Sequence, residues 1–212
     1  MIVVRPARGP REYAAACDLA EALYQRYGYC HHLEDRERDI PTVVALDGAQ
    51  MIGAVQFQRA DGGQLPIEYH FGFAADRVLC ARRHEIYEIS RLISTRGADL
   101  LVVTSLLAAV LGYAFASGFT VGVGIVKPRM VKVINRRLDI PTPPLAAHPV
   151  VQDRAGVFAP YLLRPPHPVL VYLPRADAAR YLPRLAARIA GRADIDVRGL
   201  ADRDGQQGRG GA

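Results

Sequence analysis

Tryptophan is absent from the 212-residue sequence, and cysteine is scarce. The three cysteines, Cys17, Cys30 and Cys80, lie far apart and form no Cys-x-x-Cys pair, so neither a disulfide framework nor a zinc knuckle is predicted. The histidines do not suggest a metal site either. His31 and His32 are adjacent, so their side chains diverge in any regular element, and the other histidines are far apart in the sequence. We therefore expect no metal site.

Acidic residues are outnumbered by basic ones, 21 against 27, which gives a formal net charge of +6. The basic residues are scattered along the chain, and no DNA- or RNA-binding motif accompanies them. A nucleic-acid partner is therefore not expected. A basic face could equally meet an acidic carrier protein or a phosphate-bearing cofactor.

Charged residues are also missing from Leu100 to Val126, a stretch long enough to span a bilayer. Glycines at 118, 122 and 124 interrupt its second half, which has the composition of a strand. The stretch therefore predicts a buried helix followed by a buried strand, with no stable membrane insertion. The segment Met1–Pro6 is too short and too soon charged for a signal peptide, so a cytoplasmic protein is expected.

Half of the residues are hydrophobic, which is enough for one domain with a sizeable core. We expect this domain to cover residues 1–198, and residues 199–212, which carry no apolar pattern, to form a disordered tail. Apolar periodicity predicts the elements along the chain. The expected strands are 2–5, 42–46, 51–58, 66–71, 86–94, 120–126 and 169–173, and the expected helices are 10–26, 99–117, 128–138 and 177–190. Strands packed with helices on both faces make an α/β sandwich.

The most specific string is Tyr87-Glu88-Ile89-Ser90-Arg91-Leu92, on a predicted core strand. Side chains alternate along a strand, so Glu88 and Ser90 should face one side of the sheet and Arg91 the other. A glutamate buried among apolar neighbours needs a partner or a function, because burying a lone charge is costly. The alternative is an edge strand with Glu88 and Arg91 in solvent.

This string, with Glu88-Ile89-Ser90-Arg91 followed by an apolar residue, resembles the signature of acyl-homoserine-lactone synthases and of N-acyl amino acid synthases. The resemblance extends over residues 12–173, with few identities. Both groups belong to the GNAT acyltransferase superfamily, so the resemblance implies a three-layer α/β/α sandwich with a mixed, splayed central sheet. It also implies an autoinducer synthase-like enzyme, as in quorum sensing. Such an enzyme moves an acyl group from an acyl-carrier-protein or acyl-CoA thioester to an amine, which is an amino acid or homoserine derived from S-adenosylmethionine. No cofactor would be bound permanently.

The resemblance also gives roles to individual residues. Glu88 is our candidate base, and a backbone N–H near Leu92 would polarise the thioester carbonyl. Arg91 would hold either an acidic cluster or the donor phosphate. The substrate-binding positions would be Arg26, Glu34, Asp35, Asp39 and Ser90. The donor-binding positions would be Leu92, Arg96 and Gly97.

The sequence departs from the family pattern at several positions. Homoserine-lactone synthases usually carry a tryptophan near the first acidic residue and an arginine three residues after a strand glycine. Here tryptophan is absent and that slot, counted from Gly53, is Gln56. Both departures leave an amino acid, or another amine, at least as plausible an acceptor as S-adenosylmethionine. The loop 155–161 also resembles the amino acid branch.

The turn that would cradle the donor phosphate, residues 95–99, has one arginine and one glycine, and it ends in Asp99. An aspartate there would cap the following helix but repel a pyrophosphate, which favours an acyl carrier protein over free coenzyme A as donor. Two alternatives stay open. One is a non-catalytic module of the same fold that binds an acyl chain or lipid. The other is a small-group acetyltransferase that uses acetyl-coenzyme A.

Overall fold

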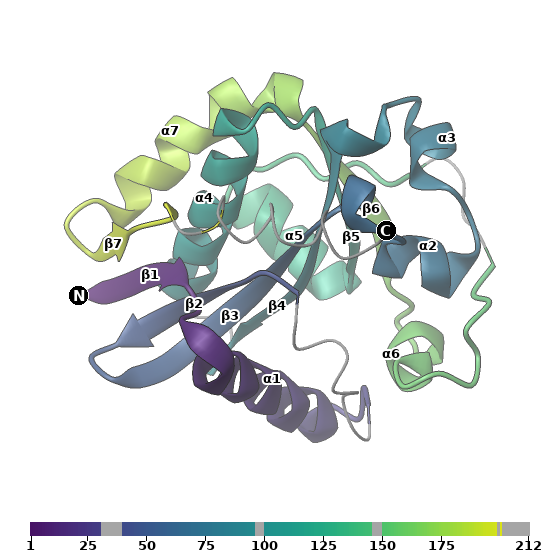
Figure 1. The fold of residues 1–212 in the computed structure, drawn as a ribbon, viewed down its shortest axis with the longest axis horizontal. Coiled ribbons are helices and arrows are strands. Elements are labelled where there is room, and N and C mark those ends of the chain that lie inside the picture. The colour runs from purple at the N-terminus through teal and green to yellow at the C-terminus, as the bar shows by residue number, and fades with distance from the viewer. Residues whose placement is uncertain (31–39, 96–99, 146–149, 199, 201–212) are drawn as a thin grey trace.

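The computed structural model describes residues 1–30, 40–95, 100–145, 150–198 and 200. Its centre is a seven-stranded mixed sheet with the strand order β6-β5-β4-β3-β2-β1-β7 (Figure 1). The strands are β1 (Ile2–Pro6), β2 (Thr42–Asp47), β3 (Gln50–Arg59), β4 (Ile86–Ser94), β5 (Val121–Val126), β6 (Val169–Pro174) and β7 (Ala193–Ile195). The β4–β5 and β1–β7 pairs are parallel, and the other neighbouring pairs are antiparallel.

Helices cover both faces of this sheet, so the expected three-layer α/β/α sandwich is confirmed (Figure 1). On one face the main core packs α4 (Leu100–Ala116), α5 (Pro128–Arg137) and α7 (Ala178–Ile189) against the strands. On the other face lie α1 (Gly9–Arg26), α2 (Pro66–Phe71), α3 (Ala75–Leu79) and α6 (Ala159–Leu163). Short 3-10 turns cover Ala60–Gly62, Arg83–Glu85 and Arg175–Asp177.

The predicted strand over 66–71 is wrong, because this segment is the helix α2. Pro66 occupies the first turn, where its missing N–H is no loss. The Glu68 carboxylate reaches back to accept the N–H of Leu65, and Gly72 ends the helix in the left-handed conformation, with φ 63°. The elements α3, α6 and β7 were not predicted from the sequence. The predicted disordered tail falls outside the described residues, apart from Leu200, which is buried.

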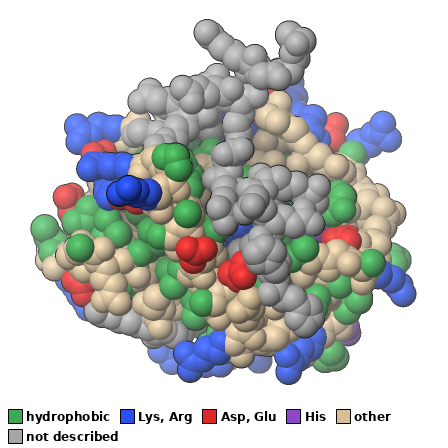
Figure 2. Space-filling view, turned by 60° about the horizontal axis from the view of Figure 1, so that its bottom comes forward, with side chains coloured by type: hydrophobic (Ala, Val, Ile, Leu, Met, Phe, Trp, Pro, Cys, Tyr) green, Lys and Arg blue, Asp and Glu red, His purple; other side chains and the backbone are tan. Residues whose placement is uncertain are grey.

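The uncharged stretch forms α4 and β5, as predicted. Ten of the seventeen α4 residues are buried in the described structure, so its apolar character is explained by the protein core. No helix among the described residues is long and apolar enough to cross a membrane. On the face shown in Figure 2, lysine and arginine side chains lie in several separate groups.

The central sheet is splayed between β4 and β5. Their parallel pairing covers three residue pairs and ends at Glu88 opposite Val123. Yet β4 continues to Ser94 beside β3, and β5 continues to Val126 beside β6. The two strands therefore part directly after Glu88.

Candidate active site

Glu88 lies at the point where β4 and β5 separate, and it is 1% exposed. Its Oε2 accepts a hydrogen bond of 3.0 Å from the backbone N–H of Ile67 in α2. Burial raises the pKa of Glu88 to about 8; the Ile67 N–H acts in the opposite direction, and the nearby Glu68 adds to the rise. A carboxyl poised near neutral pH in a buried position can accept and return a proton. The solvated edge-strand alternative for Glu88 is therefore wrong.

Arg91 sits on a β-bulge. Ser90 pairs with Gln56 and Ile93 pairs with Ala54, so two residues of β4 lie opposite one residue of β3. Arg91 has φ 49°, in the left-handed region that a non-glycine side chain adopts at a cost of about 1 kcal/mol. The bulge breaks the alternation of side chains along β4.

The bulge turns Arg91 to the face that carries α1, which is also the face of Glu88, so the expectation of opposite faces is wrong. The Arg91 guanidinium carbon lies 5.3 Å from the centroid of the Phe158 ring. Burial lowers the pKa of Arg91, while Tyr24, Cys17 and Cys30 act to raise it.

Ser90 and Gln56 are directly paired across β3 and β4, so their side chains share the face of Glu88. Gln56, the position at which the resemblance predicted an arginine in the homoserine-lactone synthases, therefore lies on this face beside Ser90. Leu92 follows on the bulge, and its side chain packs against the main core on the opposite face. The role of the N–H near Leu92 as an oxyanion donor stays a prediction.

An ion pair with a buried carboxylate supports the helix that covers Glu88. The Glu68 carboxylate accepts the N–H groups of Leu65 (2.9 Å) and Ala75 (2.7 Å). Arg83 donates to both of its oxygens, at 2.7 and 3.0 Å. Burial acts to raise the pKa of Glu68, but these donors outweigh it and the pKa is lowered. Glu68 thus stays ionised and fixes α2 over the site.

Other predicted site residues are not brought to Glu88 by the described structure. Arg26 is exposed in the last turn of α1. The acidic candidates and the donor-phosphate candidates lie outside the described residues, so their roles stay predictions. These are Glu34, Asp35, Asp39, Arg96 and Gly97.

An aromatic cluster that the sequence did not reveal lies around Lys127, directly after β5. The Lys127 Nζ donates to the carbonyls of Tyr161 (2.6 Å), Arg164 (2.9 Å) and Pro166 (3.0 Å). It also lies 4.7 Å from the Tyr161 ring centroid and 5.1 Å from that of Tyr29. Burial, followed by the charge of Arg164, lowers the pKa of Lys127 to about 8. Lys127 thus ties the loop 161–166 to the end of β5. Residues so far apart in sequence leave no local pattern that could have predicted this.

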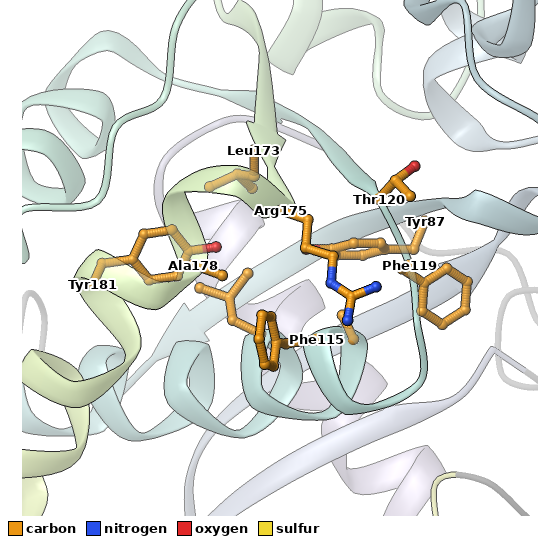
Figure 3. Close-up of a pocket in the computed structure, with 10 residues that line it drawn as sticks. Tyr87, Phe115, Phe119, Thr120, Leu173, Arg175, Ala178 and Tyr181 are labelled. Carbon is orange, nitrogen blue, oxygen red and sulfur yellow. The ribbon is translucent and has the colours of Figure 1, made fainter.

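Two cavities differ in what they can hold. The pocket in Figure 3 lies between α4, α7 and the start of β4, where the Arg175 guanidinium carbon is 4.8 Å from the Phe115 ring centroid. Its volume of about 10 Å³ suits a single water molecule. A larger open groove of about 630 Å³ lies on the Glu88 face of the sheet, between α3 and the β5–β6 edge. Its lining is mostly apolar: Val78, Leu79, Cys80, Ala81, Thr120, Val121, Leu145, Tyr172 and Pro174.

Solved structures share this architecture. FeeM, an N-acyl amino acid synthase from uncultured soil microbes, is 17% identical; the match covers 88% of this chain and 94% of FeeM, with a TM-score of 0.60. BjaI, a CoA-dependent acyl-homoserine lactone synthase with SAM and isopentyl-CoA, is 13% identical over 96% of this chain and 98% of its own, with a TM-score of 0.63. A candidate N-acetyltransferase from Lactobacillus plantarum is 14% identical over 82% of this chain and 97% of its own, with a TM-score of 0.54.

No protein-family model matches the sequence, and none of the curated proteins does. At these identities the likeness to solved structures establishes the fold. The GNAT-like fold, and the structural resemblance to acyl-homoserine-lactone and N-acyl amino acid synthases, are confirmed.

Proposed function

We propose that this protein is an N-acyltransferase that moves an acyl group from a thioester to an amine. The observation that carries the proposal is Glu88, a buried carboxyl with a pKa of about 8 at the point where β4 and β5 part. Beyond Glu88 the two strands no longer pair with each other, so an extended acyl donor could lie between them, and a proton acceptor lies at the point of separation. Acyl transfer to an amine needs both features.

In the proposed reaction the thioester lies between the parted strands, with its carbonyl oxygen at a backbone N–H near Leu92. Glu88, directly or through one water, takes a proton from the acceptor ammonium. The free amine then attacks the carbonyl carbon, the nitrogen gives up its second proton to water, the C–S bond breaks, and Glu88 returns its proton to the leaving sulfur. The mostly apolar groove on the same face offers surface for an acyl chain.

Charged residues around this centre would bind the polar parts of the substrates. Arg91 would hold either the acidic residues Glu34, Asp35 and Asp39 or the donor phosphate, because its guanidinium is permanently positive. Arg26 and Ser90 would complete the amine site. Arg96 and Gly97 would meet the donor phosphate.

For the donor we propose an acyl carrier protein, with acyl-CoA as the alternative. BjaI, a CoA-dependent synthase, supports the acyl-CoA alternative, and FeeM, an N-acyl amino acid synthase, supports an amino acid as the amine. Gln56 beside Ser90 favours an amino acid over S-adenosylmethionine as the amine. The product would be an N-acyl amino acid or N-acyl lactone, a signal molecule or lipid made by the domain 1–198.

The test is thiol release from decanoyl-coenzyme A, or from the matching acyl carrier protein, by purified protein with the common amino acids or S-adenosylmethionine. Wild type should release thiol and form an N-acyl product, and Glu88→Gln should slow this at least about a hundredfold. Glu85→Gln is the matched control, since Glu85 lies three residues earlier and its carboxylate accepts the backbone N–H of Arg82 at the protein surface. Donor binding without turnover by wild type would instead indicate a non-catalytic acyl-binding module.

A further inference from the structure

A second buried acid–base pair lies on the same face as Glu88. The His70 Nδ1 is 3.0 Å from Oδ2 of Asp153, and their side chains are 11% and 13% exposed. A carboxylate only accepts hydrogen bonds, so Nδ1 carries the proton and Nε2 of the neutral ring is left as an acceptor. Burial lowers the pKa of His70, and Asp153 acts in the opposite direction.

The loop around Asp153 is shaped to hold this pair. The backbone N–H groups of Gln152 and Asp153 both donate to the carbonyl of His70, at 2.9 and 3.4 Å. Gly156 packs directly against the Asp153 carboxylate, where a side chain at 156 would collide with it. Residues 83 apart in sequence are thus fixed as one unit.

This unit adjoins the Glu88 site through two contacts. His70 lies one turn after Ile67 in α2, on the same side of the helix, and Ile67 holds the Glu88 carboxylate. The His70 ring also lies 5.7 Å, edge to face, from Phe158, which in turn contacts the Arg91 guanidinium. His70 hydrogen-bonds Asp153 and lies 5.3 Å from the Tyr69 ring centroid, while Arg91 on β4 contacts the same Phe158 ring.

Two protons leave the attacking nitrogen, so the reaction needs a second proton acceptor besides Glu88. An ammonium that becomes an amide nitrogen loses two protons, of which one ends on the leaving sulfur and the other in solvent. Glu88 can carry only one proton at a time. Glu88 is also fully enclosed, whereas His70 is 9% exposed.

We propose that His70, oriented by Asp153, is a second catalytic base that takes the other proton from the attacking nitrogen and releases it to water. This inference rests on the proposed acyl transfer. Glu88 takes the first proton from the ammonium, and the amine forms its bond to the carbonyl carbon. The nitrogen then gives its second proton to Nε2 of His70, the C–S bond breaks, and the sulfur takes the proton back from Glu88. The imidazolium, paired with the Asp153 carboxylate, passes its proton to solvent, so atoms and charge balance.

The alternative is that the His70–Asp153 hydrogen bond only holds the Asp153 loop against α2. The variant His70→Asn distinguishes this structural role from a catalytic one. The asparagine amide can still donate to Asp153 from the place of Nδ1, but nothing replaces Nε2. We expect kcat for decanoyl transfer to fall about a hundredfold with Tm nearly unchanged, and added imidazole to restore part of the rate of His70→Ala. His84→Asn, at an exposed histidine, is the control and should keep the wild-type rate.

Wild-type activity retained by His70→Asn would overturn the role of His70 and leave the acyltransferase proposal standing. Absence of transfer by wild type with every donor and amine would overturn the proposed function, and this inference with it. Gly156→Ala gives a second measurement, since it displaces the Asp153 carboxylate without touching the ring. Its rate should fall less than that of His70→Asn, and an unchanged rate would contradict a positioning role for Asp153.

Discussion

The backbone N–H of Ile67 donates to the Glu88 carboxylate over 3.0 Å, which joins helix α2 to the strand at the parting of the sheet. This bond favours the charged form of Glu88, but burial outweighs it and the pKa rises to about 8. The carboxyl is therefore protonated in much of the protein at neutral pH. It can lose and regain its proton within the range in which an enzyme works.

Glu88 should make stability depend on pH in a defined direction. The folded state keeps a proton that the unfolded chain loses near its ordinary pKa of 4.5. The resulting stabilisation is complete below pH 4.5, and it is lost as the pH rises to about 8.

Glu88→Gln, which resembles the protonated acid, should match the unfolding free energy of wild type near pH 5. Near pH 9 it should exceed wild type by about 2–5 kcal/mol. Urea denaturation at both pH values measures this. Equal stabilities near pH 9 would mean that the pKa of Glu88 is not raised.

Replacing Arg91 should lower the activity of the protein while leaving its stability nearly unchanged. In Arg91→Gly the left-handed backbone at φ 49° becomes unstrained, which offsets the lost contact with Phe158. We expect an unfolding free energy within about 1 kcal/mol of wild type but at least a hundredfold lower turnover. Arg91→Lys keeps the charge and the strain, and it should retain more activity than the glycine variant. A glycine variant that turns over like wild type would show that the Arg91 side chain has no part in the reaction.

Arg83 should stabilise the folded protein through its ion pair with Glu68. Arg83→Met leaves the Glu68 carboxylate, which is 4% exposed, without its guanidinium, and it should destabilise the protein by about 3 kcal/mol. Because the pKa of Glu68 is lowered in the folded state, this difference should shrink as the pH falls below 4.5. Arg82→Met, at the exposed neighbouring arginine, is the control, and chemical denaturation across this pH range is the measurement. A difference independent of pH would contradict an ion-pair origin.

Local patterns in the sequence predicted most of the sheet and the long helices, because apolar periodicity reports which side chains are buried. The strand prediction for residues 66–71 was wrong because the alternation of Ile67, Tyr69 and Phe71 is typical of a strand. Pro66 and the Glu68 side chain instead favour a helix. The capping contacts at the start of the helix therefore outweighed the preference of the alternating apolar residues for a strand.

The candidate site was predictable only in part. Glu88 could be singled out because a charge among apolar residues needs an explanation. The orientation of Arg91 could not be foreseen, since the bulge depends on how β4 aligns with β3. The His70–Asp153 pair and the Lys127 cluster join residues distant in sequence, and only the folded chain reveals them.

Mass spectrometry of lipid extracts from cells that express wild type or Glu88→Gln tests the central claim most directly. It requires no prior choice of acyl chain, amine or donor. The account predicts a new N-acyl species with wild type that is absent or strongly reduced with Glu88→Gln, although both proteins are folded and equally abundant. The same new species at equal levels with both proteins would contradict the assignment of Glu88 as the base of an N-acyltransferase.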